Sequence, residues 1–270
     1  MTFRIRFAKY GAVKFIGHLD VMRYFQKVIR RSELPVKYSA GFNPHQLLSF
    51  AQPLGVGITS DGEYMEAEFD DEAMLRLAGV TAAQMRDIGN GLIIPVPAKK
   101  DAPLLEQIIF DGMSRETYEG FEILSVQLNP APKANVRTEK AMSNVTAADY
   151  MVSLKDGYDC GYESEAELVD AFTEFCGQES IIVTKKSKKT EKEVDLKGYI
   201  YKAGGPEGFD LGRTSHADTY ENGQRLFMRL AAGSVVNIRP ELVLEAFLDK
   251  YDANAFQIHR METYIRDNTK

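Results

Sequence analysis

Cysteine is scarce in this sequence, which holds only Cys160 and Cys176. The two lie far apart and form no Cys-x-x-Cys pair. A disulfide scaffold needs more cysteines, so the pair suits a reducing cytoplasm and two small core residues. An iron–sulfur cluster held by three cysteines is also excluded for this chain by itself, and no cofactor or metal is predicted.

Long apolar runs are absent as well. The chain has no stretch of about 18 apolar residues, so no transmembrane helix and no membrane partner are predicted. Residues 1–7 alternate between apolar and polar side chains and lack the apolar core of a secretion signal. Both absences favour a cytoplasmic protein.

The sequence also lacks an overall positive charge, since its net charge at pH 7 is −6. This value argues against a generally basic nucleic-acid binder. The charges are unevenly distributed, however. Residues 1–50 carry nine Lys or Arg against two acidic residues, and residues 181–202 carry seven against three. Two such basic segments would form a focused binding surface if they met in space, whereas separate solvated faces would not.

Apolar residues make up 44% of the 270 residues, which is enough for packed cores in two domains of ordinary size. Residues 130–144 hold prolines and basic residues with little apolar periodicity, so a linker is predicted there. The two domains are therefore predicted over residues 1–129 and 145–270.

The apolar periodicity predicts the order of helices and strands in both halves. The first half should hold strands at 3–7, 46–50, 63–69 and 121–128, helices at 19–29, 70–86 (broken at Gly79) and 103–118, and an edge strand or covering loop at 92–97. The second should hold strands at 148–154, from 181, at 226–230 and at 256–265, helices at 163–175 and 240–251, and a loop at 203–223. Each half follows the pattern β-α-β-β-α-β. The predicted fold is α+β, with two tandem ferredoxin-like units that have antiparallel sheets.

The first strand predicts a cationic sheet face. Phe3, Ile5 and Phe7 alternate with basic residues, and we place Arg4, Arg6 and Lys9 on the face opposite the apolar one. Sheet faces that carry arginine beside aromatic residues often bind single-stranded RNA. A simple solvated face is the alternative.

A second candidate site is the stretch 30–45, which runs from the basic end of a helix into a loop of turn-forming residues. Its candidate anion-binding residues are Arg30, Arg31, Lys37, Asn43 and His45. Glycine and proline at positions 41 and 44 give this loop a defined structure, so a polyanion could bind there. An ordinary helix-to-strand connection with solvated charges would produce the same pattern.

The same stretch carries a resemblance to a known family. The motifs are Arg-x-Arg-Phe-x-Lys at 4–9, Gly-His-Leu-Asp at 17–20, Tyr-Ser-x-Gly-Phe-Asn-Pro-His at 38–45, and Gly-Ser-x-x-Asn-x-Arg-Pro-Glu at 233–241. They resemble the radical-SAM-linked family, a bacterial domain of unknown function found fused to or encoded beside B12-binding-type radical SAM proteins. The resemblance touches both ends of the chain and implies a radical SAM protein as partner. Because this chain lacks the three cluster cysteines, the resemblance implies a companion rather than the radical enzyme.

The second half offers two further candidate sites for a polyanion. Lys185, Lys186, Lys188 and Lys189 crowd one strand end, where bound phosphates would relieve their repulsion. Arg239 precedes a helix whose first N–H groups could receive an anion. A solvated hairpin tip and a plain helix cap are the respective alternatives.

Three functions follow from these residues. A non-catalytic companion of a radical SAM protein that binds RNA (tRNA or rRNA), or presents substrate, ranks first. A protein–protein adaptor for an acidic partner subunit ranks second. A ribonuclease-like enzyme ranks third, because its weak catalytic candidates, His18 and His45, have spacing that suggests no metal site and are more easily explained as capping or loop-bracing residues.

Overall fold

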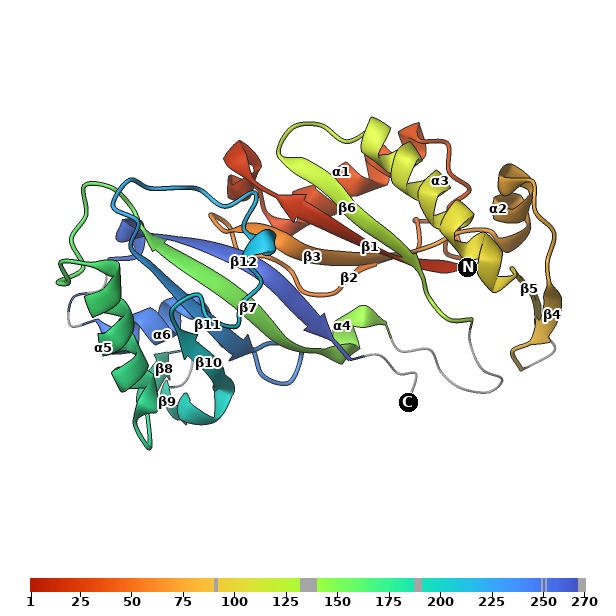
Figure 1. Ribbon diagram of the computed structural model, residues 1–270. Coiled ribbons are helices and arrows are strands. Elements are labelled where there is room, and N and C mark those ends of the chain that lie inside the picture. The colour runs from red at the N-terminus through yellow and green to blue at the C-terminus, as the bar shows by residue number, and fades with distance from the viewer. Residues whose placement is uncertain (90–91, 132–139, 187–190, 249, 251, 267–270) are drawn as a thin grey trace. The chain divides into compact units, whose positions relative to one another are not determined.

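The computed structural model (Figure 1) describes residues 1–270 except 90–91, 132–139, 187–190, 249, 251 and 267–270. The described chain divides into two compact units. The first comprises Met1–Val56 and Glu63–Asn144, and the second comprises Gly57–Gly62 and Val145–Arg266. None of the helices in the described ranges has the length and hydrophobicity needed to cross a membrane.

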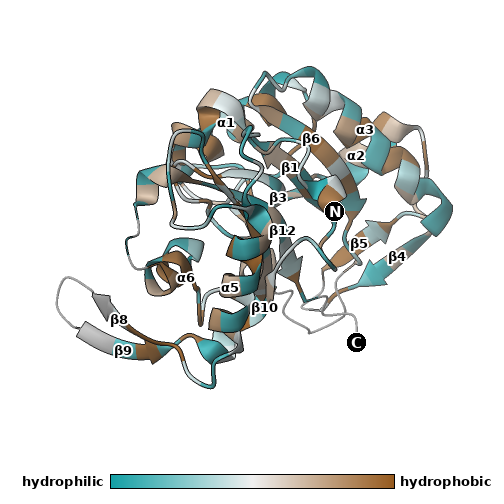
Figure 2. Ribbon diagram, turned by 60° about the vertical axis from the view of Figure 1, so that its left-hand side comes forward, coloured by the Kyte–Doolittle hydropathy of each residue, from teal (hydrophilic) through white to brown (hydrophobic). Residues whose placement is uncertain are grey.

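The first unit contains these elements in chain order: β1 (Thr2–Lys9), α1 (His18–Arg31), β2 (Leu48–Phe50), most of β3 (Thr59–Glu68), α2 (Asp71–Ala78), β4 (Gln84–Asp87), β5 (Ile93–Val96), α3 (Ala102–Arg115), β6 (Phe121–Leu128) and α4 (Ala141–Asn144). Neighbouring strands run in the order β6-β1-β3-β2, and β4 and β5 form a separate hairpin. In Figure 2, hydrophobic and hydrophilic residues alternate around α1 and α3, as expected for amphipathic helices.

The core of the first unit lies between this sheet and its helices. Phe3, Ile5 and Phe7 of β1 are buried, as their period of two predicted. The Phe7 and Phe25 rings lie 4.5 Å apart, and Phe121 stacks on Tyr24 with ring centroids 4.3 Å apart. Burying each such aromatic side chain contributes roughly 1.5–3 kcal/mol, so these rings account for much of the stability of the unit.

The second unit contains β7 (Val145–Leu154), α5 (Glu165–Gly177), β8 (Ile182–Lys186), β9 (Glu191–Asp195), β10 (Ile200–Gly204), β11 (Arg225–Ala231), α6 (Pro240–Phe247) and β12 (Phe256–Ile265). Its strands run in the order β10-β11-β7-β12, and within the described part of the chain β8 pairs with β9 alone, in a separate hairpin. Helix residues Phe172 and Phe247 pack 5.1 Å apart. The predicted loop after β10 packs back on β11, where Phe209 lies 5.5 Å from Phe227.

The α+β class is confirmed, but the strands form one mixed eight-stranded sheet rather than separate antiparallel ones. Thr59 and Ser60 at the start of β3 pair in parallel with His259 and Arg260 of β12. Gly62 permits this pairing, because a Cβ at that position would lie 2.4 Å from the Glu262 Cα. The local periodicity of β3 and β12 does not predict that the two strands pair.

Three predicted helices end earlier than their periodicity suggested, and one of them is α3, which ends at Arg115 rather than at residue 118. Asp70 caps α2 by accepting a hydrogen bond of 2.8 Å from the Ala73 N–H, and Gly79 ends the helix with a left-handed φ of 65°. Residues 84–86, which were predicted to be helical, belong instead to β4. The predicted helix over 240–251 stops at Phe247. The proline-containing segment 92–97 includes strand β5, which among the described residues pairs with β4 alone and so tolerates Pro95.

Candidate functional site

Arg4 and Arg6 lie on the predicted face of β1, opposite the buried aromatic residues, but Arg4 is ion-paired. Its Nη2 lies 3.3 Å from Oε1 of Glu66 on β3. Glu66 also accepts hydrogen bonds from the Asn129 amide (3.0 Å) and from the Ala141 N–H (2.9 Å). The Glu66 side chain is only 7% exposed. This end of the sheet face is therefore an ionic network around a nearly buried carboxylate and not an open cationic surface.

The placement of Lys9 on that exposed face is wrong, because the residue is only 1% exposed. Lys9 shares its strand face with Phe7, and its Nζ donates to the carbonyl oxygens of Lys14 (3.2 Å) and Ile16 (3.0 Å). Those carbonyls belong to the short turn that follows β1. Lys9 thus anchors this turn from inside the protein.

Beside Lys9 lies His18, the first residue of α1. The His18 ring packs edge-on against Phe50 with centroids 5.1 Å apart. Burial lowers the pKa of His18, the charge of Glu63 opposes this shift, and the charge of Lys9 adds to it. His18 therefore stays largely neutral at pH 7, inside a cluster with buried cationic and anionic neighbours.

Two more predicted cations have carboxylate partners. Lys37 Nζ lies 2.8 Å from Asp71 Oδ2. Arg31 Nε lies 3.3 Å from Glu116 Oε2, and its guanidinium sits 5.1 Å from the centre of the Tyr118 ring. Their positive charges are compensated locally, which reduces their value as phosphate ligands.

The exposed face of α1 carries the basic residues that remain available. Arg23, Lys27 and Arg30 are spaced by four and three residues, which aligns them along one stripe of the helix. Arg23 pairs with Asp20 in the same helix at 3.3 Å. Lys27 and Arg30 are exposed and have no carboxylate partner within the described part of the chain. Lys27 was not among the predicted site residues, although its spacing from Arg30 could have revealed it.

The loop that follows α1 presents aromatic and polar side chains to solvent. Tyr38 is exposed, and Phe42 is fully exposed on a loop that Gly41 turns with a φ of 112°. The loop is braced at its base, where the His45 N–H donates to Ser39 Oγ (3.1 Å) and the His45 ring Nδ1 lies 2.8 Å from the same oxygen.

A hydrogen bond also fixes this loop beside the helix. The Gln46 amide donates to the Gln26 carbonyl oxygen at 3.3 Å, which places the base of the loop next to the middle of α1. Asn43 is exposed at the tip. We define the α1–loop surface as Lys27, Arg30, Tyr38, Phe42, Asn43 and His45.

The family comparison can now be set beside this geometry. A family model described as an uncharacterized protein conserved in bacteria (DUF2344) matches residues 2–92 and 99–240. The chain belongs to this family. No curated protein matches the chain. The matched residues include the whole α1–loop surface.

The two histidines proposed as a weak catalytic pair have separate surroundings in this family member. His45 is held by Ser39 in the exposed loop, whereas His18 packs on Phe50 beside buried Lys9. No contact between them is found among the described residues. The site thus offers no paired imidazoles for acid–base chemistry.

The other two histidines, which sequence reasoning did not consider, meet in the second unit. Asp61 on β3 contacts the His216 ring Nδ1 and accepts a hydrogen bond from the His216 N–H at 3.2 Å. His259 Nε2 lies 3.5 Å from Asp61 Oδ2, the oxygen that accepts from the His216 N–H, and its Nδ1 lies 2.9 Å from Thr59 Oγ1. Burial alone would raise the pKa of Asp61, but a hydrogen bond and the charge of His259, together with hydrogen bonds from the His216 ring and N–H, outweigh it and lower that pKa to about 2. The network ties the loop after β10 to the sheet.

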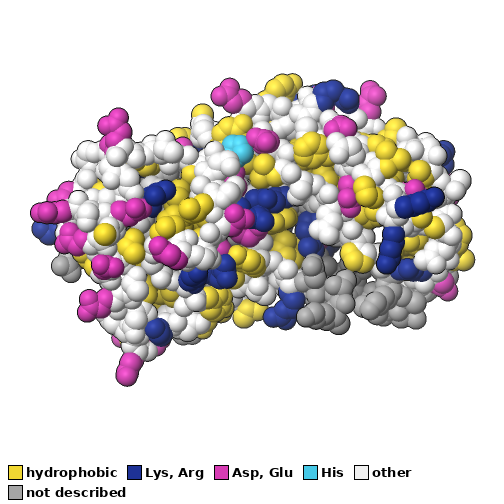
Figure 3. Space-filling view, in the orientation of Figure 1, with side chains coloured by type: hydrophobic (Ala, Val, Ile, Leu, Met, Phe, Trp, Pro, Cys, Tyr) yellow, Lys and Arg dark blue, Asp and Glu magenta, His cyan; other side chains and the backbone are white. Residues whose placement is uncertain are grey.

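The predicted cations of the second half all belong to the second unit. Lys185 and Lys186 lie on β8, in backbone register with Lys192 and Glu191 of β9, while Lys188 and Lys189 fall outside the described residues. Arg239 is exposed at the start of α6. On the face shown in Figure 3, basic and acidic side chains are interspersed.

The two cysteines are unpaired and half-buried. Burial raises the pKa of the Cys176 thiol to about 12, so it is an unreactive packing residue. Within the described residues, no three His, Cys, Asp or Glu side chains are arranged to hold a metal ion.

Proposed function

We propose that this chain is a non-catalytic companion of a radical SAM protein, and that it binds RNA (tRNA or rRNA) through its α1–loop surface. The radical SAM partner rests on the resemblance of the motifs at 4–9, 17–20, 38–45 and 233–241. The RNA-binding role rests on the side chains exposed by the first unit. The single observation that carries it is Phe42, which stands fully exposed on the loop that follows α1, the helix that carries the exposed cations Lys27 and Arg30.

This combination of side chains suits single-stranded RNA. An exposed phenylalanine offers a stacking platform for a base, which is worth roughly 1–3 kcal/mol per base in proteins of this kind. Lys27 and Arg30 supply charge for the adjacent phosphates, and Asn43 and His45 offer hydrogen bonds to base edges. A protein with a net charge of −6 needs such a local arrangement, because its overall field repels nucleic acid.

We further propose that both units are ferredoxin-like. The strand order β6-β1-β3-β2 in the first unit, and β12-β7-β11-β10 in the second, correspond to one another and support this assignment. Proteins with such units often bind RNA on the helix-free sheet face. We place the site instead on α1 and its loop, because Glu66 and Ala141 occupy that face near Arg4.

Fluorescence anisotropy with labelled single-stranded fragments of tRNA and rRNA tests the proposal. Phe42→Ala should weaken binding about tenfold, as expected for one lost stacking contact. The matched control is Tyr201→Ala, which removes an exposed aromatic residue from β10 of the second unit and should leave affinity unchanged. Absence of binding, or an equal loss in both variants, would refute the proposal.

An adaptor role is the second candidate, and exposed apolar side chains favour it. Phe15 and Leu19 lie four residues apart around the start of α1, and both are well exposed. A pulldown with the radical SAM protein, after nuclease treatment, separates this role from RNA binding. Capture that survives the nuclease and fails in a Phe15→Ser, Leu19→Ser variant would establish direct docking. The ribonuclease alternative has no comparable support.

A further inference from the structure

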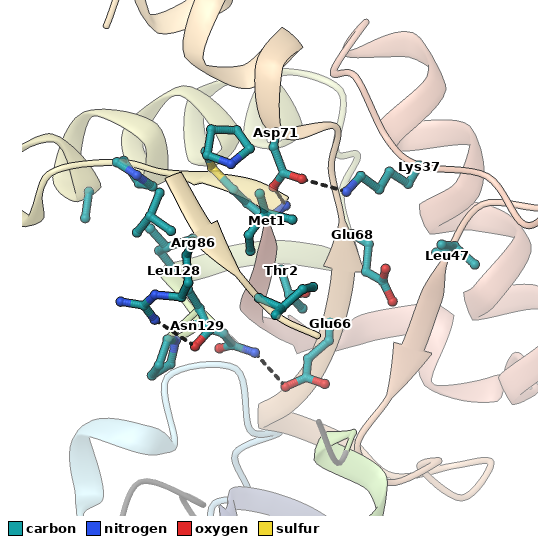
Figure 4. A pocket seen from close by; sticks show the side chains of 18 of the residues that line it. Met1, Thr2, Lys37, Leu47, Glu66, Glu68, Asp71, Arg86, Leu128 and Asn129 are labelled. Atoms are coloured by element: carbon teal, nitrogen blue, oxygen red, sulfur yellow. Dashed lines mark hydrogen bonds and ion pairs between the residues drawn. The ribbon is translucent and has the colours of Figure 1, made fainter. Parts of the chain in front are cut away.

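A large cavity in the first unit is separate from the α1–loop surface. Its volume is about 680 Å³, which lies within the usual range of about 300–1,000 Å³ for small-molecule sites. Residues of β2, β3, the β4–β5 hairpin and the segment after β6 line it (Figure 4).

The β4–β5 hairpin forms one wall by strand alternation. Gln84 pairs with Val96 and Arg86 pairs with Ile94, so these four side chains share one face, and all four line the cavity. The neighbouring Ile93 belongs to the opposite face and is exposed. Within the described residues the hairpin pairs with no strand of the main sheet, so it can present this face to a ligand.

Apolar side chains dominate the body of the cavity. The apolar lining residues include Leu47 and Leu48 at the start of β2, and Ile88, Ile94 and Val96 in and beside the β4–β5 hairpin. Such a surface, left in contact with water, gains free energy when an apolar ligand covers it.

The charges around the cavity are of two kinds. The carboxylates of Glu66 and Asp71 are already satisfied, by the Asn129 amide and by Lys37 respectively, as the dashed lines in Figure 4 show. Glu68 also lines the cavity, and its carboxylate has no ion pair within the described residues. Arg86 has no carboxylate partner in the described residues; its Nη1 donates only a long bond of 3.4 Å to the Ala131 carbonyl oxygen.

Two further cations, Lys99 and Lys140, line the same cavity and are exposed to solvent. The cavity therefore combines an apolar body with three cations, Arg86, Lys99 and Lys140, that have no ion pair in the described part of the chain, against one such carboxylate, Glu68. A guanidinium such as that of Arg86 is suited to bind a carboxylate or phosphate with paired hydrogen bonds.

We infer that this cavity binds an amphipathic organic anion: an apolar chain or ring system that ends in a carboxylate or phosphate. The apolar part lies between Leu48 and Ile94, and the anionic group is held by Arg86. The inference does not depend on the proposed RNA function, because none of its residues belongs to the α1–loop surface.

Displacement of 8-anilinonaphthalene-1-sulfonate from the full chain tests the chemistry. This fluorescent probe is itself an apolar ring system with one anionic group. Decanoate and decyl phosphate should displace it at concentrations about tenfold or more below those needed for decanol or decylamine, because only the anions can pair with Arg86. Equal displacement by decanol, or no binding of the probe, would overturn the inference.

Two pairs of variants test the location. Ile94→Trp should fill the cavity and abolish binding, whereas Ile93→Trp places the same side chain on the outer face of the hairpin and should leave binding intact. Arg86→Gln should remove the preference for decanoate over decanol, and Arg76→Gln on α2 should retain it. If the members of either pair behave alike while remaining folded by circular dichroism, the site lies elsewhere.

Discussion

Arg4 and Glu66 face one another on neighbouring strands of the first unit, with Arg4 Nη2 3.3 Å from Glu66 Oε1. The pair joins the Asn129 amide and the Ala141 N–H in one network around a nearly buried carboxylate. The arginine that the sequence suggested for an RNA partner thus stabilises the protein itself.

Removing the Glu66 carboxylate should destabilise the protein. Glu66→Ala deprives Arg4, Asn129 and Ala141 of a shared acceptor, and we expect a loss of about 3 kcal/mol in the free energy of unfolding measured in urea. Glu72→Ala is the control, because Glu72 is 76% exposed and pairs with Arg76 only within the α2 surface. That variant should lose less than about 1 kcal/mol. Similar losses in both would show that the Arg4–Glu66 network adds no stability.

Replacement by alanine should change the stability of the protein in opposite directions at two glycines, Gly62 and Gly112. Gly62→Ala brings a methyl group to 2.4 Å from the Glu262 Cα, so the backbones must separate and stability should fall by more than about 2 kcal/mol. In α3, a Cβ at Gly112 would meet the Leu34 side chain at an ordinary 3.5 Å. Gly112→Ala should therefore gain about 0.5–1 kcal/mol from helix propensity. Thermal and urea unfolding measure both, and a tolerated Gly62→Ala would argue against the close approach of β3 to β12.

Stability should depend on the ionisation of Asp61. Its pKa falls from an ordinary 3.8 to about 2 on folding, so the unfolded chain takes up the proton first as pH falls. The resulting contribution, about 2 kcal/mol, is complete above about pH 4 and is lost as pH falls toward 2.

Urea unfolding of the protein and of Asp61→Asn at about pH 5 and pH 3 measures this dependence. The difference in unfolding free energy between the two proteins should shrink at the lower pH. Asp170→Asn, at an exposed position of α5, is the control and should show a difference that does not change with pH. A constant difference for Asp61→Asn would contradict the assignment of its low pKa.

Lys9 should act on His18 rather than on a ligand. Its charge contributes to the lowered pKa of His18, so Lys9→Met should raise that pKa in an NMR titration of the ring. The exposed residue Lys27 offers a comparison, since Lys27→Met should leave the His18 titration unchanged. No shift in Lys9→Met would mean that the two side chains do not interact.

Local patterns in the sequence were sufficient to predict most of the helices and strands. The alternation of Phe3, Ile5 and Phe7 and the left-handed glycine at Gly79 both reflect interactions between near neighbours. The same holds for the stretch from Arg30 to His45, whose exposed loop was predicted as a candidate site.

Contacts between distant residues were not accessible in this way. Asp61 and His216 are 155 positions apart, and Gly62 meets Glu262 only because β3 and β12 lie side by side. The ion pair of Lys37 with Asp71 likewise depends on tertiary structure, so charge counting overestimated the free positive charge. The prediction that Lys9 lies on the exposed face was wrong for a simpler reason. Residues two apart in a strand share a face, so Lys9 lies with Phe7 on the buried one.

The salt dependence of RNA binding tests the central proposal most directly. The affinity for a labelled single-stranded RNA should be measured between low and physiological salt for the protein, for Lys27→Gln, Arg30→Gln, and for Arg4→Gln as the ion-paired control. The account predicts that the unmodified protein binds with a clear salt dependence. The double variant should show a logarithmic slope that is shallower by about 1.4, as expected for two lost phosphate contacts on a single strand, while Arg4→Gln keeps the original slope. No binding, or a slope unchanged in the double variant, would contradict it.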